Sequence, residues 1–294
     1  MTVTPPAGAS MSVRQILDKY NLRPRKELGQ HFLADPNILR KIVEAADLSP
    51  ETVVLEIGPG LGMLTRWLAE AADRVLAVEL DEGMIGVLRE ELAYLPNLEL
   101  VQGDILQLDP AALIGDPTSS DLGSTPLGYT VVANLPYYIT SAAIRHLLEA
   151  EPPPNRLVLT VQLEVARRIV AEPGDMSLLA VSVQFYGRPR IIAKIPAGAF
   201  APPPKVDSAV VRIDTYGAPQ VDVPDVEVFF RVARAGFAQK RKQIKNALGA
   251  GLGLPPEEVA AVMARTGIEP QRRAQTLSLV EWAALAREFG QYQV

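Results

Sequence analysis

The chain has 294 residues, 48% of them hydrophobic and 21% charged, which suits a globular protein with one large and one smaller domain. It has no cysteine, so disulfides and thiolate chemistry are excluded, and its two histidines, His31 and His146, are too few to indicate a metal site. No run of about 18 apolar residues could span a membrane, and residues 1–12 lack the features of a signal peptide. We therefore expect a cytoplasmic protein with neither a metal nor a membrane partner.

Strand and helix patterns alternate through the first half of the chain. Short apolar runs at 53–57, 74–80, 98–104, 129–134 and 156–162 predict strands. Apolar residues at helical spacing lie between them, for example Leu64, Trp67, Leu68 and Ala71. This alternation predicts an α/β fold, a parallel sheet with helices on both faces.

The pattern changes toward the C-terminus. LLAVSVQFYG (178–187), RPRIIAKI (188–195) and VVRID (210–214) are strand-like, whereas only helical patterns follow Pro224, at 224–238, 241–248, 256–266 and 279–289. We therefore expect three parts: an N-terminal tail and lead-in (1–27), a sheet domain (28–215) and a smaller all-helical domain (224–294). The Gly/Ser/Pro-rich residues 115–128 predict a surface loop within the sheet domain.

A glycine-rich turn joins the first predicted strand to the next helix. In Glu56-Ile-Gly58-Pro-Gly60-Leu-Gly62 the glycines let the backbone approach a ligand near an electropositive helix N-terminus. A dinucleotide-binding loop would require Gly or Ala at position 63, where Met63 stands. The Glu-x-Gly-x-Gly-x-Gly form instead resembles the loop of S-adenosylmethionine-binding enzymes.

Two acidic residues end the next two predicted strands. Glu79 could accept hydrogen bonds from both hydroxyls of a ribose, and Asp104 could accept one from an adenine amine. Each could equally be an ordinary exposed acid at a strand end. Because open α/β sheets bind ligands at the carboxyl ends of their strands, the glycine turn and these two acids together favour a nucleoside-containing cofactor.

The segment Asn134-Leu135-Pro136-Tyr137 is suited to methylating an amine conjugated to an aromatic ring. The Asn134 carbonyl and the adjacent backbone carbonyl can accept N–H bonds and draw the lone pair out of conjugation. Pro136 restricts the backbone, and Tyr137 offers a face on which a base can stack. The structural alternative is a strand end followed by a proline turn.

Several segments together resemble the small-subunit (16S) rRNA adenine dimethyltransferases. They lie in the expected order at 28–33 (LGQHFL), 56–62 (EIGPGLG), 78–81 (VELD), 102–106 (QGDIL), 134–140 (NLPYYIT), 200–208 (FAPPPKVDS) and 235–248 (AGFAQKRKQIKNAL). Some members of that family have Asn in place of His31 and in place of Tyr138. The resemblance implies a Rossmann-like class I S-adenosylmethionine-dependent methyltransferase sheet with a helical C-terminal domain.

The resemblance also implies roles for individual residues. Cofactor contacts are expected at His31, Leu33, Gly58, Gly60, Glu79, Asp104 and Asn134. The target base is expected at Asn134, Tyr137 and Phe200, with Phe200 stacking opposite Tyr137. The implied reaction is dimethylation of the N6 amines of two adjacent adenosines near the 3′ end of 16S rRNA, within immature 30S particles, by a monomeric enzyme.

Basic residues are concentrated near the C-terminus. The net charge is −5, but residues 228–294 contain ten Lys/Arg and five Asp/Glu. Segment 231–245 has six basic residues and no acid: Arg231, Arg234, Lys240, Arg241, Lys242 and Lys245. We expect these to contact RNA phosphates, although a solvated helix face would look similar.

Two other functions remain open from the sequence. An antibiotic-resistance methyltransferase acting on 23S rRNA would keep the same chemistry, and the FAPPPKVDS form and the helical tail favour the 16S enzyme by resemblance only. A non-catalytic ribosome assembly factor could use the same fold. The intact Glu79, Asp104 and Asn134 favour an enzyme over that alternative.

Overall fold

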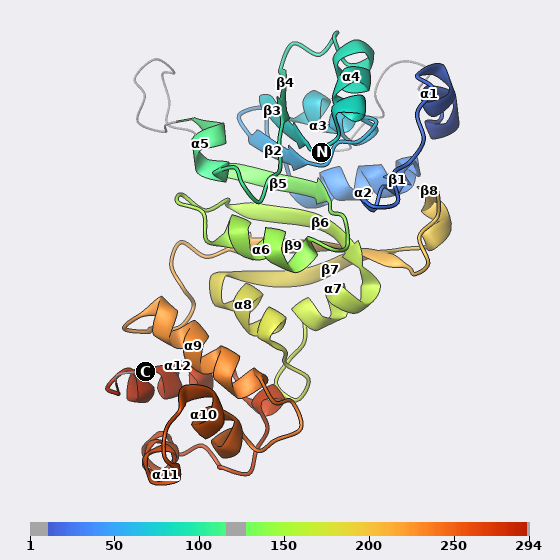
Figure 1. Cartoon of the computed structure of the whole chain (residues 1–294). Helices are drawn as coiled ribbons and strands as arrows, with labels where there is room; N and C mark the ends of the chain where they lie inside the picture. The colour runs from blue at the N-terminus through green and yellow to red at the C-terminus, as the bar shows by residue number, and fades with distance from the viewer. Residues whose placement is uncertain (1–10, 116–127, 293–294) are drawn as a thin grey trace. The chain divides into compact units, whose positions relative to one another are not determined.

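The computed structural model describes residues 11–115 and 128–292, so the expectations for residues 1–10 and for most of the 115–128 loop lie outside the described residues. The described chain forms two compact units. The first comprises the chain up to Ala166 together with Arg190–Thr215, and the second comprises Arg167–Pro189 and the residues from Tyr216 onward. The α/β prediction for the first part and the helical prediction for the C-terminal part are confirmed (Figure 1).

The main sheet of the first unit has a mixed order. Among the described residues its strands run β4 (Leu98–Gln102), β3 (Arg74–Glu79), β2 (Val53–Ile57), β5 (Tyr129–Asn134), β6 (Arg156–Gln162), β9 (Ser208–Thr215) and β7 (Gly187–Ile195). Strands β4 to β6 are parallel, and β9 is antiparallel to β6. Within this sheet the chain therefore forms β2 first and continues outward through β3 to β4. It then crosses back to form β5 on the other side of β2. The carboxyl ends of β2 and β5 become neighbours where the order reverses, which is where such sheets bind ligands.

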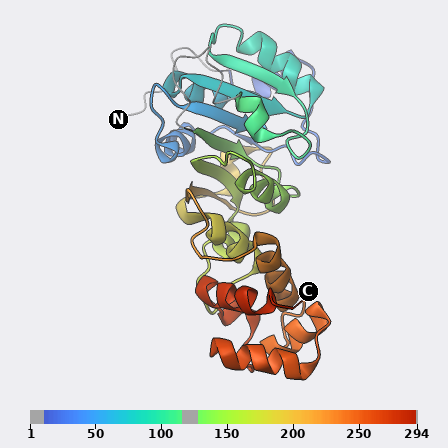
Figure 2. The same cartoon turned by 90° about the vertical axis from the view of Figure 1, so that its left-hand side faces the viewer.

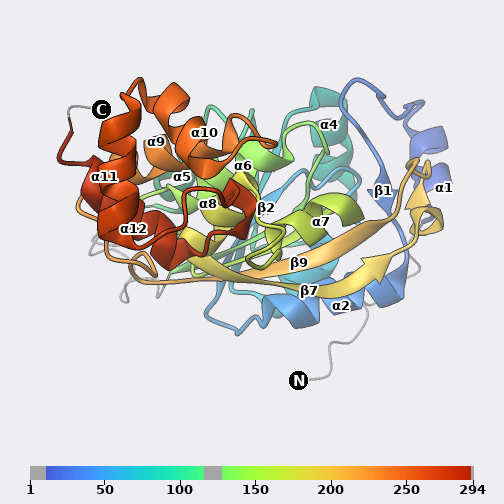
Figure 3. The same ribbon diagram turned by 90° about the horizontal axis from the view of Figure 1, so that it is seen from below.

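Helices cover both faces of this sheet. They are α2 (Pro36–Ala46), α3 (Thr65–Ala71), α4 (Glu82–Glu91), α5 (Pro110–Ile114), α6 (Thr140–Leu148) and the start of α7 (Leu163–Ile169). Helices α2 and α3 bury Ile42 and Leu68 against valines of the central strands. Figure 3 shows α2 on one side of the β7–β9 edge and α6 on the other.

A short helix lies within residues 1–27, the expected N-terminal tail and lead-in. Helix α1 (Val13–Lys19) begins at Ser12, whose side chain accepts a bond from the Gln15 backbone in a capping box. Its Ile16 is fully buried and packs with Met84 of α4. No helix was expected in this lead-in, because its apolar face packs on a partner about seventy residues away, which local patterns do not reveal.

A two-stranded sheet joins two distant segments of the first unit. Strand β1 (Phe32–Leu33) pairs antiparallel with β8 (Phe200–Ala201), and Leu33 stands opposite Phe200. The 3₁₀ turn η1 (Ala197–Ala199) precedes β8. This pairing holds the Leu28–Leu33 segment beside the carboxyl ends of the main strands.

The second unit is helical. Helices α8 (Leu178–Tyr186), α9 (Val226–Phe237), α10 (Ile244–Leu252), α11 (Pro256–Thr266) and α12 (Leu279–Phe289) surround an aromatic core, with the 3₁₀ turn η2 (Ala274–Thr276) before α12. Phe185 and Phe229 stack there with ring centroids 4.5 Å apart, and Trp282 is fully buried. Figure 2 shows α9 to α12 in orange to red. No helix in residues 11–115 or 128–292 is long and apolar enough to cross a membrane.

The strand expected at 178–187 is a helix, and it belongs to the helical unit. Ser177 caps α8 by accepting a bond from the Ala180 backbone, 3.2 Å away. Val181 and Phe185 of α8 pack into the core of the second unit. The apolar–polar alternation of Val181–Phe185 is typical of a strand, but packing against the aromatic residues of α9 stabilises a helix here. The expected sheet domain 28–215 is therefore interrupted by residues 167–189.

Candidate active site

The glycine turn brings backbone to the carboxyl end of β2. Gly58, Gly60 and Gly62 have φ of 69°, 57° and 75°, the left-handed region that suits glycine. A Cβ at Gly62 would lie 2.7 Å from Leu92 Cδ1, so a side chain there would displace the core. The Gly58 N–H donates to the Val78 carbonyl over 2.9 Å, which ties the turn to the neighbouring strand.

Glu79 at the end of β3 fixes this turn from the side. Its Oε2 accepts a bond from the Gly60 N–H at 3.0 Å, and its Oε1 accepts one from the Asp81 N–H at 2.9 Å. Only 7% of the residue is exposed, and this burial raises the pKa of the carboxyl, an effect that the backbone bonds oppose. Each oxygen retains a further lone pair for a ligand hydroxyl.

Glu56 also lines the cavity, although it was singled out in the sequence only as part of the glycine-turn motif and not as a site residue. It is 1% exposed, and burial raises the pKa of its carboxyl to about 8. The Thr65 hydroxyl lies near enough to oppose that shift, yet the pair forms no bond of normal geometry, since Glu56 Oε2 and Thr65 Oγ1 both lack a partner within the described structure. The signal was present in the sequence, because Glu56 is the one charged residue in the otherwise apolar strand Val53–Ile57.

Asp104 follows β4 and stands next to an apolar wall. Its Oδ1 accepts a bond from the Leu106 N–H at 3.0 Å, which closes the turn after the strand. Ile105 and Leu106 line the same cavity. A carboxylate beside apolar side chains can recognise the polar edge of a flat ring while the wall contacts its face.

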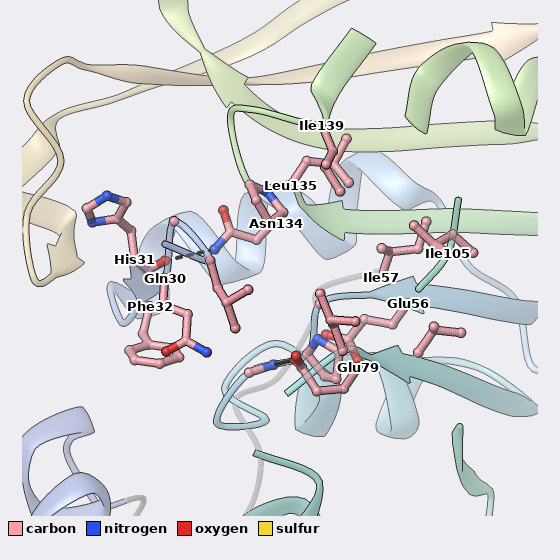
Figure 4. A pocket seen from close by; sticks show the side chains of 18 of the residues that line it. Gln30, His31, Phe32, Glu56, Ile57, Glu79, Ile105, Asn134, Leu135 and Ile139 are labelled. Carbon is pink, nitrogen blue, oxygen red and sulfur yellow. Dashed lines mark hydrogen bonds between the residues drawn. The ribbon is translucent and has the colours of Figure 1, made fainter. Parts of the chain in front are cut away.

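Asn134 ends β5 with its amide held in one orientation. Its Nδ2 donates to the His31 backbone carbonyl over 3.0 Å, as the dashed line in Figure 4 shows. Neither Asn134 Oδ1 nor the Leu135 carbonyl accepts a hydrogen bond from the residues that the structure describes. Figure 4 places Asn134 and Glu79 on opposite sides of the cavity. The loop therefore presents two free acceptors at its wall.

Tyr137 is held by contacts at both ends of its side chain. Its hydroxyl lies 2.8 Å from Ser208 Oγ of β9, and its ring stacks on His31 with centroids 6.0 Å apart and an angle of 25° between the planes. His31 Nδ1 donates to the Pro202 carbonyl over 2.8 Å. Burial raises the pKa of the Tyr137 hydroxyl, so the ring stays neutral at physiological pH.

Phe200 does not take its expected place opposite Tyr137. It is 4% exposed and packs with Leu33, Ile195 and Val210 in the core of the first unit, and it is not among the residues lining the cavity. The β1–β8 pairing puts it beside Leu33 and directs it into that core. The ring that stacks on Tyr137 in this structure is that of His31.

One cavity of about 270 Å³ collects the other expected site residues of the first unit. It is lined by His31, Leu33, Gly58, Gly60, Glu79, Asp104, Asn134 and Tyr137. Gln30 and Tyr138, which the sequence did not single out as site residues, line it as well. Gln30 donates to Asp81 over 2.9 Å and so connects the Leu28–Leu33 segment to the start of α4.

The six basic residues of segment 231–245 lie in the second unit. Arg231 and Arg234 are on α9, Lys245 is on α10, and Lys240, Arg241 and Lys242 are in the connection between them. All are exposed except Arg231, which is partly buried. None lies within 4.0 Å of a carboxylate in the part of the chain that the structure describes, whereas Arg265 and Arg272 of the same unit are paired. Their charges are therefore free for a ligand.

Comparison with known protein families identifies the family to which this chain is related. The model of the ribosomal RNA adenine dimethylase family matches residues 21–291. The chain belongs to this family. The match covers both units, and so includes the cavity and the basic segment.

Curated members of this dimethylase family are similar over nearly their whole length. The ribosomal RNA small subunit methyltransferase A of Dehalococcoides mccartyi strain 195 is 47% identical over 272 residues, 92% of this chain and 90% of that protein. The protein of the same name from Pelotomaculum thermopropionicum is 46% identical, over 94% of this chain and 95% of its own.

Solved structures agree on the dimethylase fold. A dimethyladenosine transferase from Plasmodium falciparum matches with a TM-score of 0.75 at 26% identity, over 89% of this chain and 98% of its own. The 23S rRNA methyltransferase ErmE matches with a TM-score of 0.68 at 30% identity, over 88% of this chain and 100% of its own. The fold prediction of a methyltransferase sheet with a helical C-terminal region is confirmed.

Proposed function

We propose that this protein transfers methyl groups from S-adenosylmethionine to the N6 amines of two adjacent adenosines near the 3′ end of 16S rRNA. Family membership and the names of the curated relatives support the reaction and the substrate. The observation that carries the proposal is the cavity itself, which Asn134 and Leu135 line together with the glycine turn and Glu79, and whose Asn134 Oδ1 and Leu135 carbonyl have no donor among the described residues.

The residues present fit the cofactor. The glycine turn exposes backbone, Glu79 offers free lone pairs to a ribose, and Asp104 offers a carboxylate to an adenine amine beside Ile105. When bound, S-adenosylmethionine supplies a methyl group on a positively charged sulfur with a neutral leaving group.

Asn134 and Leu135 would act on the target amine by accepting its hydrogens. Two N–H bonds to carbonyl oxygens draw the nitrogen lone pair out of conjugation with the ring, which makes the amine a better nucleophile. After each transfer the methylated nitrogen loses one proton to water. A once-methylated amine therefore has a single N–H, so one of the two carbonyls gives up its bond in the second transfer. Because the His31 carbonyl fixes the Asn134 amide, the Asn134 oxygen does not need to be reoriented for either step.

Tyr137 would hold the plane of the base. A half-buried neutral ring can stack on adenine and favour the positive charge that develops on nitrogen. A base stacked in a helix hides its N6, so the substrate adenosine must be unpaired or extruded. We assign the exposed cations of 231–245 to phosphate contacts that retain the RNA without reading its sequence.

The direct test is incubation with radiolabelled S-adenosylmethionine and small-subunit particles that lack these methyl groups. We expect label in the 16S rRNA, confined to a short 3′ fragment. Large-subunit particles in a parallel reaction should remain unlabelled. Label in 23S rRNA with none in 16S rRNA would identify the ErmE-like activity instead, and binding to particles without any transfer would favour an assembly factor.

A further inference from the structure

Tyr138 is exposed in a way that the rest of its loop is not. It is 61% exposed, whereas Leu135 is buried and Tyr137 and Ile139 are partly buried. It nevertheless lines the cavity. Its ring belongs to none of the hydrophobic clusters described above, so core packing does not explain an aromatic residue at this position.

The backbone beneath Tyr138 is well fixed. The Ile139 N–H donates to the Pro136 carbonyl over 3.2 Å, and the Thr140 hydroxyl donates to the same carbonyl over 3.3 Å. Helix α6 begins immediately afterwards, at Thr140. A rigid turn that presents a ring to solvent loses little conformational freedom when a ligand stacks on it.

A turn formed by residues 26–29, which carries the exposed Lys26 and Glu27, lies beside this ring. A Cβ built on Gly29 would be 3.8 Å from two ring carbons of Tyr138, so the turn that contains Gly29 is its neighbour. The Gly29 N–H donates to the Lys26 carbonyl over 3.0 Å, which places Lys26 in the same turn. Lys26 is exposed and has no carboxylate within 4.0 Å among the described residues, whereas Arg25 lies 3.5 Å from Asp81.

We propose that Tyr138 and Lys26 form a subsite for the nucleotide adjacent to the adenosine being methylated. The neighbouring base stacks on the Tyr138 ring, and Lys26 contacts its phosphate. Exposed aromatic rings beside unpaired cations are how proteins hold single-stranded nucleic acid. This inference rests on the proposed function. Because the two target adenosines of the proposed function are adjacent, this subsite holds one of them while the other occupies the cavity.

The test compares variants of two equally exposed tyrosines. Tyr94 is 60% exposed on the same unit and does not line the cavity, so Tyr94→Ala is the matched control for Tyr138→Ala. We expect Tyr138→Ala to raise KM for unmethylated small-subunit particles about tenfold, the order of one lost base–aromatic stack, with cofactor affinity and melting temperature unchanged. Tyr138→Phe and Tyr94→Ala should behave like wild type.

A spectroscopic readout tests the stacking directly. A short RNA with 2-aminopurine next to the target adenosine should lose fluorescence on binding to wild type and to Tyr138→Phe, and should keep it with Tyr138→Ala. Lys26→Gln should reduce the slope of log affinity against log salt concentration by about one, as expected for the loss of a single phosphate contact. Lys41→Gln, on the exposed face of α2, should leave this slope unchanged.

The outcomes separate this subsite from the proposed function. If wild type methylates 16S rRNA and Tyr138→Ala has an unchanged KM, the subsite is overturned and the function stands. A fall in melting temperature or cofactor affinity in Tyr138→Ala would also overturn it, because the ring would then be structural. Absence of transfer by wild type would overturn the function itself.

Discussion

The two halves of the cavity are built differently. On the side of β2 and β3, polar groups are already engaged with backbone, as when Glu79 accepts bonds from Gly60 and Asp81. On the side of β5, Asn134 Oδ1 and the Leu135 carbonyl have no donor among the described residues. The first half is organised by the chain alone. The second holds acceptors in place for the donor that, in the function proposed above, the substrate brings.

Asn134→Ala should have the largest effect, and it tests the second half. Removing the side-chain acceptor should lower kcat by about 10²- to 10³-fold, the usual cost of deleting one group that stabilises a transition state. Single-turnover transfer to small-subunit particles measures this. Asn37→Ala, an exposed asparagine at the start of α2, is the control. Full activity in Asn134→Ala would refute the assigned role.

Glu79→Gln should act on the first half instead. The change replaces an acceptor oxygen by an amide donor, which cannot serve both the Gly60 N–H and a ribose hydroxyl. We expect cofactor affinity to fall about 10- to 100-fold, as for other lost bonds to charged groups. Calorimetric titration with S-adenosylmethionine measures it, with Glu82→Gln on the exposed start of α4 as control. Equal cofactor affinities in the two variants would contradict the assignment of cofactor binding to the β2–β3 side of the cavity.

The Tyr137–Ser208 contact should give a smaller effect that a double-mutant cycle can isolate. Tyr137→Phe and Ser208→Ala each remove the same hydroxyl pair, so each should lower kcat about fivefold, as expected for one neutral hydrogen bond. The double variant should be no slower than either single one. Additive losses would show that the two hydroxyls act separately.

Glu56→Gln should alter stability rather than transfer. Burial raises the pKa of Glu56 to about 8 in the folded state, so the folded protein binds its proton more tightly than the unfolded chain does. The contribution of this group to the free energy of unfolding is fully present below the usual glutamate pKa. It is lost as pH rises toward 8, by at most about 1.4 kcal/mol per pH unit.

Thermal melts from pH 5 to 8 measure this effect. Over that range the melting temperature of Glu56→Gln should fall less than that of wild type. The raised pKa of Glu79 contributes to the fall in both proteins, so the difference between the curves reports Glu56. The exposed Glu70→Gln should follow wild type. Parallel curves for Glu56→Gln and wild type would mean that Glu56 is already ionised in the folded protein.

Local patterns in the sequence were enough to predict the parts of the site that follow strand ends. The glycine turn, Glu79, Asp104 and Asn134 each follow a short apolar run, and parallel strands bring their carboxyl ends to one edge. The helices after Pro224 were equally accessible, because their apolar spacing is regular. The family resemblance added the roles of these residues.

What the sequence did not reveal depends on pairing between distant segments. Phe200 turns into the core because β8 pairs with β1, and α8 is helical because Phe185 finds the aromatic residues of α9. The Tyr137–Ser208 contact joins residues 71 positions apart. None of these partners is visible in a local window, since each is chosen by tertiary packing.

The identity of the product tests the central claim most directly. Two free carbonyl acceptors beside a stacking ring are suited to an exocyclic amine, not to a ring nitrogen or carbon. Mass spectrometry of nucleosides from small-subunit RNA treated with the enzyme should therefore show N6,N6-dimethyladenosine, with the monomethylated form as an intermediate. Methyl groups on a ring atom of adenine, or on another base, would contradict the account.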